Sequence, residues 1–137
     1  MNPILNILYI GDSPEYFQII NENKNVSLIA LENSIQATNY LHSNKAPQAI
    51  ICHYNLPGNN GLFLFDWIRA HAEYHAIPFI LLAKEFNSDL YKLAFRKRVD
   101  DFYVTSVTNP KDILHRVAFL NLHKKVSKIS KLPSKDS

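Results

Sequence analysis

The sequence predicts a single α/β domain built on a doubly wound, five-stranded parallel sheet flanked by five helices. Short apolar runs alternate strictly with longer helical stretches, which is typical of parallel strands joined by right-handed crossovers. The 137 residues suffice for one hydrophobic core, and 47% apolar and 20% charged residues are ordinary globular values. Because Cys52 is the only cysteine, an internal disulfide and a cysteine-rich zinc site are excluded. A single cysteine without a disulfide suits a cytoplasmic protein.

Five apolar runs have the composition of strands, rich in β-branched and aromatic residues. Two of them are apolar throughout, as expected for strands buried on both faces of a parallel sheet. The predicted strands are Ile4–Ile10, Val26–Leu31, Ala49–Cys52, Ile77–Ala83 and Phe102–Val104. Ligands and chemistry gather at the carboxyl ends of such strands, so the candidate site residues are those that end them.

Polar caps and proline mark where the helices begin. Ser13-Pro14-Glu15 predicts a first helix, and Asn33 caps a second. The third spans Leu62 to His71, after the strong loop signal of residues 55–61. Asn87 or Ser88 caps a fourth helix that runs to about Arg98, and Asn109-Pro110 starts the last.

The positive charge is concentrated in the tail. Residues 122–137 hold five lysines against Asp136, so the rest of the chain is nearly neutral. Nucleic-acid binding is therefore not expected of the domain itself, because it lacks an organised basic face. No apolar stretch approaches the length of a membrane span, so no membrane association is expected. We expect residues 1–123 to form the domain and residues 124–137 a basic Lys/Ser tail or linker, helical to about Lys128.

Four segments together resemble the receiver domains of two-component response regulators. They are ILYIGDSP, AIICHYNLPGNNG, IPFILLAK and DDFYVTSVTNP, and the resemblance covers residues 4 to about 122. When the sequence is aligned on Leu56-Pro57, the phosphoacceptor falls at position 53, the hydroxyl residue at 83 and the lysine at 105, without a gap. The resemblance implies the flavodoxin-like strand order 2-1-3-4-5 and a cytoplasmic role in phosphorelay signal transduction.

The resemblance does not extend to the residues that carry the phosphorylation chemistry of that family. Phosphoryl transfer onto a receiver needs a carboxylate nucleophile, a divalent metal, and cations or hydroxyls around the phosphoryl oxygens. The acceptor position is His53, the first acidic position is Gly11, and only Asp12 keeps a carboxylate. Ala83 replaces the hydroxyl residue and Thr105 replaces the lysine. We therefore expect a degenerate pseudo-receiver with no catalytic residue, no metal site and no cofactor.

Without that chemistry, the expected function is regulation through protein–protein contacts, independent of phosphorylation. Phe102 occupies the position of the receivers' switch aromatic, and with Ala83 nearby we expect it to be a fixed packing residue. Tyr54, beside His53, is a further candidate contact. The partner is expected to be another protein, a second copy in a homodimer, or an output domain if this is the N-terminal part of a longer response regulator. The candidate interaction face is Tyr91, Phe95, Tyr103 and Val107.

Two alternative functions stay open. The first is a conventional phospho-switch with an atypical site. The second is a small serine esterase, because Gly11-Asp12-Ser13 resembles the opening block of GDS-type esterases and Asp112 and His115 have the triad spacing. Against it, Asp112 and His115 fall in the first turns of a predicted helix, and short motifs of this kind are often fortuitous.

Overall fold

The computed structural model describes residues 4–12, 16, 18, 22 and 24–131, with side chains described as far as residue 123. Its sheet has five strands in the order β2-β1-β3-β4-β5, and every neighbouring pair is parallel. This confirms the predicted doubly wound sheet and its strand order. The strands are β1 (Leu5–Ile10), β2 (Val26–Leu31), β3 (Ala49–His53), β4 (Phe79–Ala83) and β5 (Asp101–Val104).

Four α-helices and one 3₁₀ turn lie in the described part of the chain. They are α2 (Ser34–Ser43), α3 (Gly61–Arg69), α4 (Ser88–Lys97), η1 (Thr105–Val107) and α5 (Pro110–Lys131). The helix predicted to open at Ser13 lies outside the described residues. The side chains of Asn33, Asn60 and Asn87 each accept a hydrogen bond from a backbone N–H three residues later, which caps α2, α3 and α4.

Three boundaries differ from the sequence prediction by more than one residue. The fourth strand begins at Phe79 rather than Ile77, because the Ile77 N–H bonds the Tyr74 carbonyl in a turn and Pro78 has no N–H to donate. The third helix ends at Arg69, where the chain enters that series of turns. The last helix continues to Lys131, beyond the predicted change to a linker near Lys128.

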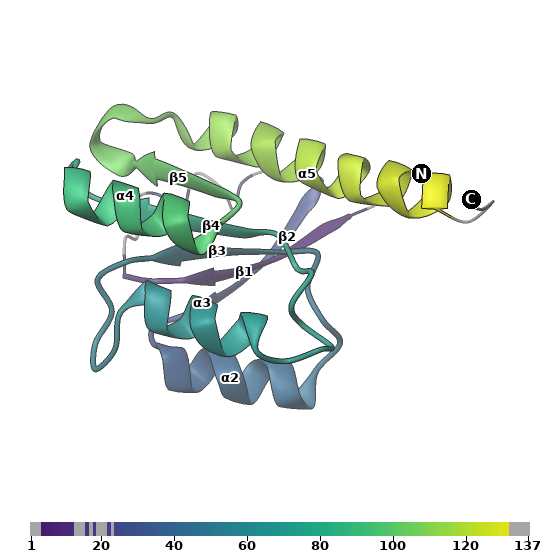
Figure 1. Ribbon diagram of the computed structural model, residues 1–137, viewed down its shortest axis with the longest axis horizontal. Helices are drawn as coiled ribbons and strands as arrows, with labels where there is room; N and C mark the ends of the chain where they lie inside the picture. Colours follow the sequence, from purple (N-terminus) through teal and green to yellow (C-terminus); the bar gives the residue numbers. More distant parts are fainter. Residues whose placement is uncertain (1–3, 13–15, 17, 19–21, 23, 132–137) are drawn as a thin grey trace.

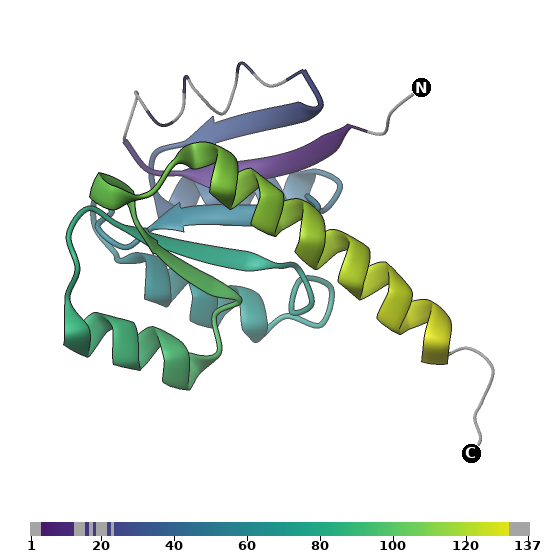
Figure 2. The same cartoon turned by 90° about the horizontal axis from the view of Figure 1, so that it is seen from above.

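The helices cover both faces of the sheet (Figures 1 and 2). On one face, α2, α3 and α4 pack against alternate strand residues such as Leu8, Ile50 and Leu81. On the other, α5 packs Ile113 and Val117 against the intervening strand residues. This alternation, which follows from the two-residue period of a strand, fixes which face each strand-end side chain joins.

Candidate functional site

The candidate site lies where β1, β3 and β4 end, and its central residue is His53 at the end of β3. The His53 side chain is buried, with 4% of its surface exposed. Its Nε2 lies 2.8 Å from the Tyr9 hydroxyl, and the two rings meet edge to face at 5.7 Å. Tyr9 is itself fully buried in β1. His53 is therefore held inside the domain by a buried partner on the central strand.

Gly11, the first residue after β1, makes room for the His53 ring. A Cβ built on residue 11 would lie 2.3 Å from His53 Cδ2 and 2.9 Å from Cγ, far inside van der Waals contact. Residue 11 also has a φ of +150°, a conformation that side-chain-bearing residues rarely adopt. The imidazole thus packs directly on the glycine backbone. His53 and Gly11 are therefore two parts of one packing arrangement.

Burial controls the protonation of His53. It lowers the pKa of the imidazole from 6.5 to about 4, and the positive charge of Lys84 acts in the same direction. The Asp12 carboxylate opposes the shift but does not reverse it. At neutral pH the imidazole is uncharged, and it shares one hydrogen bond with the Tyr9 hydroxyl whose direction depends on the tautomer.

The loop after β3 is fixed by backbone contacts. The Tyr54 N–H donates to the Leu82 carbonyl at 2.7 Å, and the Gly61 N–H donates to the Tyr54 carbonyl at 2.8 Å. A Cβ at Gly61 would lie 2.5 Å from the His53 carbonyl oxygen, so only glycine allows α3 to start this close to β3. Asn55 and Asn60 pair in an antiparallel bridge across the loop. Hydrogen bonds to β4 and to the start of α3 therefore fix the backbone next to His53.

The other positions of the site offer little polar chemistry. Asp12 and Lys84 are exposed, whereas Ala83 is a buried methyl group at the end of β4. Thr105 is half-buried in η1 and brings a hydroxyl but no charge. Among the described residues, no three His, Cys, Asp or Glu side chains are grouped so that they could hold a metal ion.

Phe102 packs inward rather than standing free. It is half-buried against the core on the α2–α4 face, and its ring meets Tyr91 edge to face at 5.8 Å. Tyr91 in turn lies 6.0 Å from Phe86, an exposed aromatic residue in the loop before α4. The three rings form a continuous row from the core to the surface.

The candidate interaction face divides into exposed and packed members. Phe95 and Val107 are 74% and 82% exposed, and Tyr91 is also exposed. Tyr103 is half-buried, and its hydroxyl donates to Asp101 Oδ2 at 3.0 Å. Burial, together with the Asp101 carboxylate, raises the pKa of Tyr103 to about 12. Tyr103 is therefore mainly a packing residue of β5.

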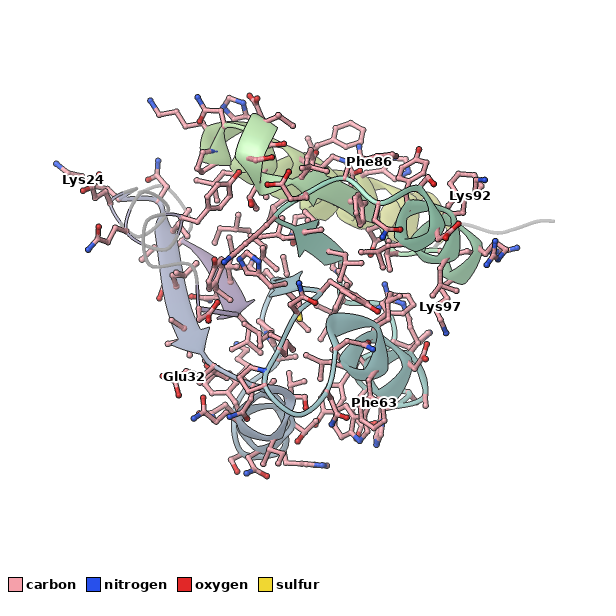
Figure 3. The ribbon with its side chains drawn as sticks, turned by 90° about the vertical axis from the view of Figure 1, so that its left-hand side faces the viewer. Lys24, Glu32, Phe63, Phe86, Lys92 and Lys97 are labelled. Carbon is pink, nitrogen blue, oxygen red and sulfur yellow. The ribbon has the colours of Figure 1, made fainter. Side chains whose placement is uncertain are left out.

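Phe86 was missed by the sequence analysis. It lies in a polar stretch, Lys84 to Ser88, where the strand pattern has already ended, and an isolated aromatic residue in such a stretch was the available signal. Figure 3, which looks onto the ends of the strands, labels Phe86 and Lys92 on the side of the molecule where α4 lies. We define the α4 aromatic surface as Phe86, Tyr91, Phe95 and Val107.

Two of the three residues of the esterase hypothesis lie in the described part of the chain. Asp112 and His115 are both exposed near the start of α5, and Ser13 lies outside the described residues. In the described residues, no helix is long and apolar enough to cross a membrane.

Comparisons with solved structures identify the architecture. The crystal structure of a protein described as a response regulator of Chloroflexus aurantiacus J-10-fl superposes on this chain with a TM-score of 0.78. The two sequences are 19% identical, and the match covers 87% of this chain and 98% of that one. The chain has the receiver fold. The signal receiver domain of a protein assigned as the LuxO repressor of Vibrio parahaemolyticus gives a TM-score of 0.78 at 20% identity over 96% and 98% of the two chains.

A third receiver-fold structure is that of the phosphorylated cyanobacterial phytochrome response regulator RcpA, with a TM-score of 0.69, 16% identity and coverage of 96% and 99%. No protein-family model matches the sequence, and a search of curated proteins yields no match. At these identities the likeness establishes the receiver fold, while the site residues must be judged from this chain alone.

Proposed function

We propose that this chain is a non-catalytic, phosphorylation-independent signalling domain that acts through protein contacts. One observation carries the proposal: the acceptor position is a buried imidazole packed on Gly11 and bonded to Tyr9. In receivers, that space belongs to the carboxylates that hold the metal and accept the phosphoryl group. Here an uncharged aromatic ring fills it.

The remaining positions support the same conclusion. Mg²⁺ is held by oxygen ligands, usually one or two carboxylates with waters, and Asp12 is the one carboxylate kept at these positions. Ala83 has no hydroxyl for a phosphoryl oxygen, and Thr105 has no charge to stabilise it. The receiver fold does sustain this chemistry elsewhere, since the similar RcpA structure is of a phosphorylated protein. We attribute the loss in this chain to its side chains and not to its fold.

Intact-mass spectrometry after incubation with acetyl phosphate and Mg²⁺ tests this part of the proposal. We expect no stable gain of one phosphoryl group, with the RcpA protein as the positive control. A gain that disappears in His53→Ala would overturn the proposal and establish a phospho-switch. Ester turnover that is lost in Ser13→Ala would instead establish a hydrolase.

A variant with the four family side chains restored separates the role of the side chains from that of the fold. We expect the combined replacements Gly11→Asp, His53→Asp, Ala83→Thr and Thr105→Lys to accept a phosphoryl group from acetyl phosphate. The single variant His53→Asp serves as the control and should not, because it lacks the second acid, the hydroxyl and the lysine. If the single variant is modified as fully as the fourfold one, the missing groups are not what prevents phosphorylation.

The α4 aromatic surface is the proposed contact with a protein partner, an output domain of a longer chain, or a second copy. Its exposed rings Phe86 and Tyr91 are in contact and continue inward to Phe102, and Lys92 and Arg96 are also exposed on α4. Single exposed apolar residues are common, but a connected row of rings is typical of interaction sites. A photo-crosslinking residue at Phe95 should capture a specific partner in cells, whereas the same residue at exposed Ile35 on α2 should not. Equal capture at both positions would contradict this surface.

A further inference from the structure

The outward side of the last helix carries a second exposed apolar surface, on which the Phe119 ring stacks on His123 at 5.9 Å and faces the Arg116 guanidinium at 5.3 Å. Phe119 and Leu122 are 54% and 63% exposed, whereas Ile113 and Val117 on the inner face of the same helix are buried. The sequence continues the same four-and-three spacing at positions 126 and 129, with valine and isoleucine, and α5 remains helical to Lys131. An apolar stripe therefore follows α5 for about 15 Å from Phe119, at 1.5 Å per residue.

The sequence positions that face the sheet along α5 change from apolar residues to lysines where the sheet ends. Ile113 and Val117 pack on the strands, but the same spacing continues with Leu120 and then lysines at 124, 128 and 131. Figure 2 shows α5 crossing the sheet obliquely and projecting beyond its edge. A helix that meets only water is expected to be polar all round. In the sequence, the outward positions 126 and 129 instead stay apolar past the sheet.

A groove adjoins this stripe. It has a volume of about 450 Å³ and lies between α5 and the starts of β1 and β2. On one side Asn121 Nδ2 donates to the Gln48 carbonyl at 2.9 Å, which ties α5 to the chain before β3. The apolar residues that line it, among those described, are Ile4, Leu5, Val26, Leu114, Ala118 and Leu122. Leu122 thus belongs both to the groove and to the stripe.

The charge of α5 and the residues after it indicates what kind of partner would bind to the stripe and the groove. Residues 113–135 contain one arginine and five lysines and neither aspartate nor glutamate. Arg116 is paired with Asp101 at 2.9 Å, so the net positive charge of this stretch comes from its five lysines. A second copy of α5 placed alongside would bring two lysine-rich helices together, which charge repulsion opposes. A complementary occupant must be acidic.

We propose that the stripe and groove of α5 bind an acidic amphipathic helix of a partner protein. Such a helix would place one or two apolar side chains in the groove and along Phe119 and Leu122, and its carboxylates beside the lysines of the α5 extension. An anionic membrane offers the same charge, but a bilayer surface supplies no single side chain to fill a groove between α5 and the strands. This surface is separate from the α4 aromatic surface and does not depend on it.

Binding to a synthetic helix tests the proposal with the full-length protein. The probe is an amphipathic peptide of about 20 residues, long enough to form an isolated helix, with leucine on one face and glutamate elsewhere. A peptide of scrambled order but identical composition is the charge control. We expect the amphipathic peptide to bind more tightly, and Leu122→Asp to weaken it by about tenfold, as loss of a central contact does. Added salt should weaken binding because the lysines contribute.

Ile35→Asp is the matched control, because Ile35 is 68% exposed on α2 and has no part in the groove. It should leave peptide affinity unchanged, and circular dichroism should show both variants folded. Equal binding of the scrambled peptide, or no effect of Leu122→Asp, would overturn the proposal. So would vesicles of phosphatidylglycerol that bind the protein and release it on Leu122→Asp while the peptide does not bind. A concentration-dependent dimer in sedimentation that Leu122→Asp dissociates would assign the stripe to self-association instead.

Discussion

The buried histidine makes the stability of this domain depend on pH in a specific range. In the unfolded chain His53 titrates near 6.5, whereas in the folded protein its pKa is about 4. Between these values the unfolded state binds a proton that the native state does not bind. Lowering the pH therefore favours unfolding in this range. Above pH 6.5 both states are deprotonated and His53 contributes no pH dependence.

The expected magnitude follows from the size of the shift. A difference of one pKa unit corresponds to about 1.4 kcal/mol, so a shift from 6.5 to about 4 lowers the free energy of unfolding by ~3 kcal/mol across that range. Because His53 is buried, solvent screening reduces this little. Relative to pH 7.5, the protein should lose about half of that by pH 5.2, with a slope near 1.4 kcal/mol per pH unit.

Urea unfolding followed by circular dichroism at several pH values measures this dependence. His53→Gln should remove most of the slope between pH 6.5 and pH 4.5. His115→Gln, at an exposed histidine of α5, should keep it. All other groups are shared by the two variants, so the difference between the variants isolates His53. If His53→Gln and the native sequence lose stability in parallel, the imidazole titrates normally and is not buried as described.

Three further substitutions test the packing around the site, each measured by urea unfolding. Gly11→Ala should cost about 2–3 kcal/mol because its methyl group meets the His53 ring, and His53→Ala in the same chain should recover part of this, so strictly additive effects would disprove the contact. Tyr9→Phe should cost about 1–2 kcal/mol by removing the hydroxyl partner of His53 Nε2, and an unchanged midpoint would show that water replaces it. Asp100→Asn should cost about 1–2 kcal/mol, because one carboxylate oxygen accepts both from Arg69 at 2.9 Å and from a backbone N–H at the start of β4, while a neutral effect would place the pair in solvent.

The sequence predicted the strands from local patterns of apolar runs and capping residues, and predicted their order from the resemblance that the spacing of the strand ends carries. It also placed His53 correctly at the end of β3. It did not predict the Tyr9–His53 bond. Tyr9 and Ile51 are paired in register, so His53 lies two residues further along β3, and the Tyr9 hydroxyl reaches its Nε2 at 2.8 Å. Such a contact between strands far apart in sequence leaves no local pattern.

The contact between Gly11 and His53 couples these two positions. An aspartate at position 11 would collide with the imidazole ring, so the family's first acid cannot return while His53 is present. An aspartate at position 53 alone would leave the space beside Gly11 empty and would bury a carboxylate with one acidic neighbour, Asp12. Burial without a metal or a cation raises the pKa of a carboxyl group and keeps it neutral, which makes it a poor nucleophile. Neither single change leads back to a working site. The histidine, the glycine and the buried tyrosine therefore form a stable alternative packing of this end of the sheet.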